Sequence, residues 1–271
     1  MGKAEIKLEP SGERMIVDGY QSSVQDYVIY LLHLATYEYA RQFVSEMNVL
    51  DYGCGSGYGA GIISSQARSI VAVDVDEEAI YFAKNHYEAN NIEFKRIDPA
   101  QGLPFTDDQF DTVLSFQVFE HVQDTAAYLS EIRRVLRPGG KLVLVTPDRS
   151  TRLLPFQKPW NRWHLKEYDR EGLRSELSRH FSQVEMLGMT ARKDMINVEI
   201  RRCTKIKWLT LPFTLPIVPE NLRIAALNAI HRVRGRGAGQ GGRPREYPYQ
   251  IDDVVISADA SPSVNLIAIA S

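Results

Sequence analysis

The sequence contains only two cysteines, Cys54 and Cys203, in 271 residues. So few cysteines exclude a disulfide-stabilised scaffold, and we expect both to be reduced thiols. No apolar run approaches the ~20 residues needed to span a bilayer, and the first ten residues lack the apolar segment of a secretory signal. The formal net charge is only −2, which gives the whole molecule no general attraction for nucleic acid. These absences predict a cytoplasmic protein with no nucleic-acid partner.

What the sequence does contain is 44% hydrophobic residues in a regular alternation of strand and helix patterns. Near-continuous apolar strands separated by helices predict a doubly wound α/β fold, with a mostly parallel sheet covered on both faces. The regular alternation of strand and helix patterns ends at about Thr190. The predicted strands are 49–52, 69–74, 92–97, 112–116, 141–146, 181–187, 254–257 and 265–270, and the predicted helices are 24–43, 77–90, a segment capped by Asp124, 171–179 and 221–233.

A glycine-rich turn, VLDYGCGSGYGA at 49–60, follows the first long strand. Gly53, Gly55 and Gly57 alternate there, and such a turn takes positive φ angles and lets a ligand approach the backbone closely. The alternative is a tight strand–helix connection that binds no ligand. Three alternate glycines would destabilise such a connection, and a ligand that must approach the backbone would explain their presence. We therefore predict that these glycines and Cys54 contact a cofactor.

The nature of that cofactor depends on Asp51. Residues 55–60 satisfy the G-x-G-x-x-G/A pattern of dinucleotide-binding proteins, but that match alone is weak. A carboxylate two residues before the first glycine would repel a pyrophosphate and attract an ammonium group. S-adenosylmethionine carries an amino group and a sulfonium and has no phosphate. The turn therefore predicts S-adenosylmethionine rather than a nicotinamide dinucleotide.

Two further carboxylates follow the next strands. Asp74 ends the strand 69–74, where an acidic residue accepts hydrogen bonds from both ribose hydroxyls; its alternative role is a helix N-cap. Asp98 follows the third strand and is positioned to accept from the adenine amino group, or else is an ordinary loop carboxylate. The neighbouring residues assigned to the same cofactor site are Val75, Pro99, Phe116 and Gln117.

The glycine turn, Asp74 and Asp98 are followed in order by FDTV at 110–113, EHV at 120–122 and LRPGG at 136–140. In this order the motifs resemble class I S-adenosylmethionine-dependent methyltransferases of the type 11 kind, over about residues 47–190. The resemblance implies a seven-stranded sheet whose last strand is antiparallel, a place that 265–270 would take. It also implies one methyltransferase domain, divided into a helical N-terminal cap (1–46), a cofactor-binding core (47–190), a C-terminal insert (191–250) and closing strands (251–271).

Three short signals, GER at 12–14, WNRWH at 160–164 and DD at 252–253, resemble methyltransferases associated with bacterial surface-glycan synthesis. They imply O-methylation of a small molecule or a glycan. A quinone or natural-product methyltransferase is the alternative within the same class. A nicotinamide-dependent oxidoreductase, which Asp51 disfavours, and a cofactor binder without turnover are the alternatives of other classes.

Two histidines are candidate general bases for an alcohol acceptor. His121 follows the fourth parallel strand, at the edge where ligands bind in open α/β sheets; the alternative is that it only shapes the pocket. His164 directly follows Trp163 in WNRWH, next to two tryptophans whose faces suit a sugar or a flat ring, or which form a packing cluster. In the related quinone O-methyltransferases, acids near His121 hold a divalent ion. Gln117 and Val118 occupy part of that run here, so no metal is predicted.

Two segments outside the core are expected to complete the site. The N-terminal helix would close over the cofactor, with Tyr20 or Tyr27 at its methionine end. Residues 201–245 carry ten arginines and lysines and one acidic residue, Glu220, beside the apolar run 206–218. We interpret this insert as a candidate for peripheral contact with an anionic membrane or a phosphorylated lipid carrier. A solvated insertion with a basic loop is the alternative.

Overall fold

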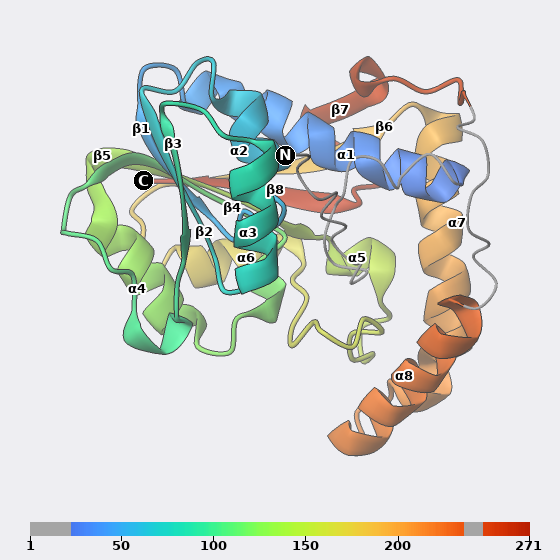
Figure 1. The fold of residues 1–271 in the computed structure, drawn as a ribbon. Coiled ribbons are helices and arrows are strands. Elements are labelled where there is room, and N and C mark those ends of the chain that lie inside the picture. The colour runs from blue at the N-terminus through green and yellow to red at the C-terminus, as the bar shows by residue number, and fades with distance from the viewer. Residues whose placement is uncertain (1–22, 236–245) are drawn as a thin grey trace, which may run out of the picture.

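A computed structural model describes residues 23–235 and 246–271 and shows one α/β sheet with helices on both faces (Figure 1). The strand order is β3-β2-β1-β4-β5-β8-β6-β7. Strands β1 to β5 pair in parallel, β8 lies antiparallel between β5 and β6, and β7 pairs antiparallel with β6. The strand bounds are β1 Asn48–Tyr52, β2 Ser69–Asp74, β3 Ile92–Arg96, β4 Phe110–Phe116, β5 Leu136–Pro147, β6 Val184–Ala191, β7 Val254–Ser257 and β8 Asn265–Ala270.

The doubly wound, mostly parallel sheet is confirmed, and 265–270 is the antiparallel strand within it. The seven-stranded core that the resemblance implied is present, and the strand predicted at 254–257 adds an eighth to the sheet. The additional strand is β7, which pairs with β6 outside the seven-stranded core. Val255 in β7 is 49% exposed, as expected for a short strand at the edge of a sheet.

Two buried hydrophobic clusters fill the space between the sheet and its helices. Side chains of α1, α2, α3 and α7 belong to one cluster, and those of α4 and α6 belong to the other. The helices are α1 Val24–Ala40, α2 Tyr58–Ile63, α3 Glu77–His86, α4 Thr125–Val135, α5 Arg149–Arg152, α6 Arg170–Leu177, α7 Lys193–Thr210 and α8 Glu220–Gly235, with short 3-10 segments η2 Arg41–Phe43, η3 Pro99–Gln101, η4 Phe119–His121, η5 Leu211–Phe213 and η6 Ile251–Asp253.

Polar side chains begin these helices in the expected way. The Asp124 carboxylate accepts from the backbone N–H of Ala127, which confirms it as the N-cap of α4. Asp76, and not Asp74, caps α3 by accepting from the N–H groups of Glu78 and Ala79. The carboxylate of Asp74 is thereby left for the turn at the end of β1.

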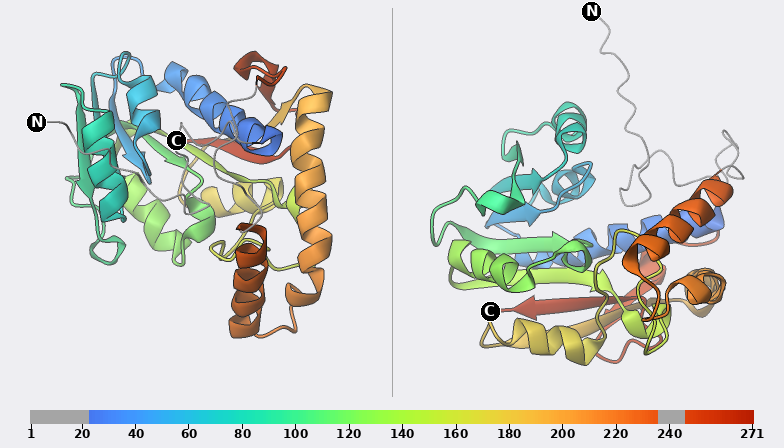
Figure 2. Two further views of the ribbon diagram at one scale, coloured as in Figure 1. Left: turned by 45° about the vertical axis from the view of Figure 1, so that its right-hand side comes forward. Right: turned by 90° about the horizontal axis from the view of Figure 1, so that it is seen from below.

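The region after Thr190 contains an 18-residue helix, α7, where the sequence pattern predicted no regular structure. Its buried face combines apolar residues with Glu199, which pairs with Arg202, so the hydrophobic periodicity is weak. Figures 1 and 2 show the C-terminal part of α7 and the whole of α8 projecting beyond the sheet. No helix within the described ranges combines the length and the apolar character needed to cross a bilayer.

Candidate active site

The glycine turn between β1 and α2 has the conformation that the sequence predicted. The φ angles of Gly53, Gly55 and Gly57 are 90°, 53° and 82°, a region that favours glycine. A Cβ at Gly53 would also lie 2.3 Å from Cγ2 of Val118. The N–H groups of Gly53 and Cys54 donate to the carbonyl oxygen of Val73, which ties the turn to β2. At Gly53 and Gly55 the turn therefore presents backbone atoms to this end of the site.

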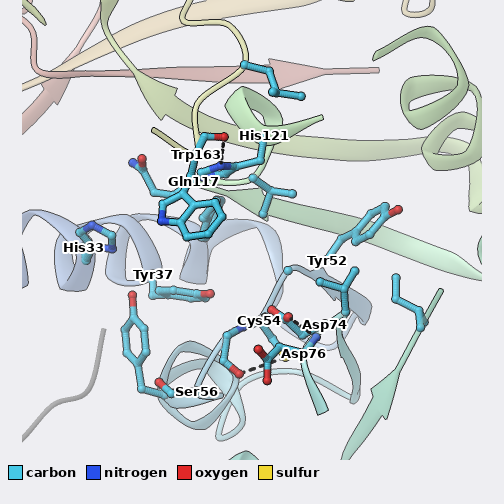
Figure 3. A pocket seen from close by; sticks show the side chains of 18 residues that line it. His33, Tyr37, Tyr52, Cys54, Ser56, Asp74, Asp76, Gln117, His121 and Trp163 are labelled. Atoms are coloured by element: carbon cyan, nitrogen blue, oxygen red, sulfur yellow. Dashed lines mark hydrogen bonds between the residues drawn. The ribbon is translucent and has the colours of Figure 1, made fainter. Parts of the chain in front are cut away.

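A cavity of about 570 Å³ opens beside this turn at the carboxyl ends of the parallel strands (Figure 3). Its size suits a small organic ligand. Of the predicted cofactor residues, Gly53, Cys54, Gly55, Asp74, Val75, Phe116 and Gln117 line it. Other lining residues are His33, Tyr37, Tyr52, Ser56, Tyr58, Asp76, Ile97, Val118, His121, Trp163 and Leu165.

The Asp74 carboxylate lies at the rim of the turn. Its Oδ2 accepts from the N–H of Gly55 at 2.9 Å, and its Oδ1 accepts from the N–H of Asp76 at 2.9 Å. A carboxylate oxygen has more than one acceptor position, so these bonds fix the group and leave room for ligand hydroxyls. Ribose binding by Asp74 therefore stays a prediction that the geometry allows.

Asp51 is not part of the cavity wall; it lies buried next to it, with 1% of its surface exposed. The Tyr37 hydroxyl, which does line the cavity, donates to its carboxylate, 3.3 Å from Oδ2. Burial raises the pKa of Asp51 to about 7, against the opposing effect of the Tyr37 hydrogen bond. Asp51 therefore faces the cavity through Tyr37, and with this pKa its protonation changes near neutral pH.

Three other predicted cofactor residues also lie off the cavity wall. Gly57 begins α2, and a Cβ there would lie 2.6 Å from Cβ of Ala83, so it serves the packing of α2 against α3. Asp98 is exposed and accepts from the N–H of Ala100, which caps the η3 segment that Pro99 begins. A contact of Asp98 and Pro99 with adenine stays a prediction.

His121 lies at the opposite end of the cavity from Asp74 (Figure 3). Its Nδ1 is 3.0 Å from the carbonyl oxygen of Trp163. A carbonyl can only accept, so Nδ1 carries the hydrogen, and in the neutral ring Nε2 is the basic nitrogen. Trp163 itself lines the cavity and is 51% exposed. This end of the cavity therefore has a basic nitrogen next to an aromatic face.

His164 lies behind His121, buried and away from the cavity wall. The two ring centroids are 4.9 Å apart at an interplanar angle of 87°. His164 Nδ1 is 2.7 Å from Oε1 of Glu167, whose carboxylate also receives two hydrogen bonds from Arg152. Burial alone would raise the pKa of Glu167, but Arg152 and His164 outweigh it and lower the value to about 2. His164 is thus fixed by a permanently charged carboxylate.

Trp160 does not sandwich His164 with Trp163 as the sequence suggested. Its ring stacks on the guanidinium of Arg152, 4.1 Å from the ring centroid, and its Nε1 donates to the Arg152 carbonyl. Of the two tryptophans, only Trp163 lines the cavity. Trp160 instead supports the Arg152–Glu167 pair from behind.

Glu120 completes a buried group with the two histidines. Its Oε2 accepts from the Thr146 hydroxyl at 2.9 Å, while Oε1 has no hydrogen-bond partner within the described part of the chain. Burial raises the pKa of Glu120, and His164 and His121 act against that rise. One ligand atom from each of the three residues lies within 4.8 Å of the others, so the donor set is also one that a metal ion would accept.

The N-terminal helix α1 does border the cavity, but through His33 and Tyr37 rather than through the tyrosines that the sequence suggested. Tyr27 donates to the carbonyl of Tyr249 and is not part of the cavity wall, and Tyr20 lies outside the described residues. Tyr37 is the tyrosine of α1 that lines the cavity. The available signal was Gly59 in α2: a Cβ there would lie 1.9 Å from Cζ of Tyr37, so the glycine makes room for this ring.

The comparison with known proteins agrees with this geometry. Residues 50–144 match the model of a methyltransferase domain family. A probable S-adenosylmethionine-dependent methyltransferase of Mycobacterium tuberculosis is 35% identical over 183 residues, which cover 67% of this chain and 64% of that protein. The chain carries a class I S-adenosylmethionine-dependent methyltransferase domain. S-adenosylmethionine is the cofactor that this family implies.

Proteins named for different activities are similar to this methyltransferase domain in sequence or in fold. A ubiquinone biosynthesis O-methyltransferase of Dinoroseobacter shibae is 32% identical over 127 residues, covering 45% of this chain and 51% of that protein. A solved methyltransferase of Thermotoga maritima has a TM-score of 0.57 at 14% identity, over 93% of this chain and 97% of its own. The solved cyclase SpnF has a TM-score of 0.54 at 16% identity, over 89% and 81%. The shared fold alone therefore does not define the reaction.

The residues of the methyltransferase site fit S-adenosylmethionine. The turn offers backbone rather than bulky side chains at Gly53 and Gly55, as close approach of a ligand requires. Asp74 would offer acceptors to ribose hydroxyls, and buried Asp51 with Tyr37 would offer the polarity that an ammonium group needs. The Asp51 carboxylate would oppose a pyrophosphate in the same place, whereas an acid at the position of Asp74 binds ribose in dinucleotide sites as well.

Proposed function

We propose that this protein transfers the methyl group of S-adenosylmethionine to an oxygen of a small-molecule or glycan acceptor. When bound, the cofactor supplies a methyl group on a sulfonium, which is already activated for in-line displacement. The observation that carries the proposal is the continuity of one cavity, which has the glycine turn and Asp74 at one end and His121 at the other. A donor and an acceptor can therefore meet within it.

The chain's contribution at the cofactor end is to hold and orient the donor. The N–H of Gly55 and the carboxylate of Asp74 are already bonded to each other, so little reorganisation is needed for ribose binding. Tyr37 contacts Phe116 and Tyr58 edge-on, and these packed rings keep its hydroxyl directed at Asp51. Fixed alignment of this kind can supply ~7–11 kcal/mol of a two-reactant barrier.

At the acceptor end, His121 is the proposed general base. Its Nε2 would accept the proton of an acceptor hydroxyl as the oxygen attacks, a contribution of typically ~10²–10⁴-fold. The Trp163 carbonyl orients the ring through Nδ1. Glu120, buried beside the ring, would stabilise the positive charge that His121 gains. His164 and Glu167 act on this group from behind, as positioning residues.

The acceptor would bind at the end of the cavity that Trp163 and Leu165 line. The side chains of Trp163 and Leu165 make the acceptor end largely apolar. A flat aromatic ring would stack there, as would the apolar face of a sugar. The similarity to ubiquinone biosynthesis O-methyltransferases supports a phenolic or quinone-type acceptor as the second candidate.

Incubation with methyl-labelled cofactor and fractionated cell extracts tests the proposal. We expect label to enter a fraction of the glycan or small-molecule pool with the wild-type protein and not with His121→Ala. Label in the quinone fraction would favour the second candidate. Binding of S-adenosylhomocysteine without label transfer to any fraction would instead make the protein a cofactor binder.

A further inference from the structure

The helical hairpin formed by the end of α7, η5 and α8 exposes an unusual number of large apolar side chains. Ile217 is 86% exposed, and Trp208 is 57% exposed. This hairpin projects beyond the sheet in Figures 1 and 2. We call the exposed apolar set the hairpin surface: Trp208, Leu209, Phe213, Ile217, Leu222 and Ile224. Exposed large apolar side chains gathered on a projecting hairpin indicate a binding surface rather than ordinary surface composition.

Basic residues on α7 extend this surface. Arg201, Lys205 and Trp208 are all exposed and follow one another at four- and three-residue spacing, so they lie on one face of α7. The charge is smaller than the sequence suggested, because Arg202 pairs with Glu199 and the buried Arg223 pairs with Glu220. The combination of a cationic helix face with exposed tryptophan and isoleucine is typical of helices that lie in the interface of an anionic bilayer.

The hairpin is rigidly joined to the acceptor end of the cavity. The backbone N–H and the Nζ of Lys158 donate to the carbonyls of Thr214 and Val218, both at 2.8 Å. Arg162 donates to the Asn228 side chain at 2.7 Å. The chain then continues directly into Trp163, which lines the cavity. A partner bound at the hairpin surface would therefore be held next to the entrance for the acceptor.

We propose that the hairpin surface docks this protein on an anionic lipid bilayer, with its apolar side chains inserted at the headgroup level. The proposal does not depend on methyl transfer, because it concerns a surface outside the cavity. A second copy of the chain is the competing occupant. Exposed Arg201 and Lys205 beside the apolar set favour the anionic bilayer, since a symmetric contact would bring these cations together.

Vesicle co-sedimentation tests the proposal with the whole chain. The probes are phosphatidylcholine vesicles and vesicles of equal parts phosphatidylcholine and phosphatidylglycerol. We expect the wild type to bind the mixed vesicles and hardly to bind the neutral ones. Each of Trp208→Ser and Ile217→Ser should weaken binding about tenfold or more, because each removes an apolar side chain that the bilayer would bury. Arg201→Gln and Lys205→Gln should each weaken it about fivefold.

Tyr81→Ser is the matched control, because Tyr81 on α3 is an equally exposed aromatic residue, at 58%, outside the hairpin surface. It should bind vesicles as the wild type does. Absence of binding to the mixed vesicles, or binding that Trp208→Ser and Ile217→Ser leave unchanged, would overturn the proposal. A dimer in vesicle-free solution that Ile217→Ser dissociates would also overturn it, in favour of a second copy.

Binding of S-adenosylhomocysteine should be the same for all these variants, because none of the substituted residues lines the cavity. This measurement shows that each variant is folded. The two measurements also distinguish the two proposals. If the wild type binds S-adenosylhomocysteine but not the mixed vesicles, only the membrane proposal fails. If it binds the mixed vesicles but not S-adenosylhomocysteine, only the proposed function fails.

Discussion

The hydroxyl of Tyr37 lies 3.3 Å from Oδ2 and 3.4 Å from Oδ1 of Asp51, and it donates to a carboxylate that solvent does not reach. Tyr37 lines the cofactor cavity, while Asp51 lies just outside its wall. Burial raises the pKa of Asp51 to about 7. This pair therefore makes the charge beneath the glycine turn dependent on pH and on the charge of the ligand.

Cofactor affinity should accordingly depend on pH. An ammonium group near Asp51 favours the carboxylate, so binding releases a proton wherever the free protein is protonated. We expect affinity for S-adenosylhomocysteine to fall up to about tenfold per pH unit below about 7 and to level off above it. Calorimetry in two buffers with different ionisation heats would detect the proton. An affinity that is flat between about pH 6 and about pH 8 would contradict this.

The same shift predicts a stability effect without ligand. A folded-state pKa raised from 3.8 to about 7 means that the folded protein holds this proton more tightly than the unfolded chain. The free energy of unfolding therefore decreases as the pH rises from about 4 to about 7, and the loss is complete above that window. Asp51→Asn removes the ionisable carboxyl group and with it this loss, so it should stabilise the unliganded protein at alkaline pH by up to about 4 kcal/mol.

Urea unfolding at about pH 8 and about pH 4 would check this, with the exposed Glu88→Gln as the control carboxylate. The difference between Asp51→Asn and wild type should be large at the higher pH and absent at the lower one. An equal effect at both would mean that asparagine acts through packing or hydrogen bonding rather than through the charge.

Gly59→Ala should disturb the site through Tyr37. The new methyl group would lie 1.9 Å from Cζ of Tyr37, so the ring must move away from Asp51. We expect a loss of about 1–3 kcal/mol in unfolding free energy, together with weaker cofactor binding. Gly61→Ala in the same helix contacts the half-buried Tyr87 instead, and it should cost stability while cofactor affinity stays unchanged. If both variants bind the cofactor equally well, the position of Tyr37 has no influence on cofactor binding.

The two histidines should differ in kinetics. His121→Gln removes the proposed base and should lower kcat by about 10²-fold or more with little change in KM. His164→Gln leaves His121 in the cavity wall, so its effect on kcat should be smaller and should appear as an altered pH profile. Initial rates measured across the pH range would compare them. A larger loss for His164→Gln would reverse these assignments.

Several elements could be predicted closely because one physical signal dominates them. Strands β2, β7 and β8 have the bounds that the sequence predicted, and in β2 and β8 short apolar runs are mostly buried. The glycine turn was predictable because positive φ angles exclude most other residues. Asp124 was predictable because its carboxylate caps a helix from a local position.

Features that depend on distant contacts were not predictable. Helix α7 was missed because its buried face contains the Glu199–Arg202 pair, and because the apolar run 206–218 continues past the end of α7 at Thr210. Asp111 and Arg137 belong to the family motifs, yet they form a salt bridge that joins β4 to β5 and do not line the cavity. Tyr37 comes to Asp51 only through the packing of α1 over α2.

Calorimetric titration with S-adenosylhomocysteine and, separately, with NAD tests the central claim most directly, which is that the cavity beside the glycine turn binds a cationic amino acid nucleoside and not a dinucleotide. We expect S-adenosylhomocysteine to bind wild type, Asp51→Ala to weaken that binding about tenfold or more, and NAD to show no binding to either. Binding of NAD to the wild type, or full S-adenosylhomocysteine affinity in Asp51→Ala, would contradict it.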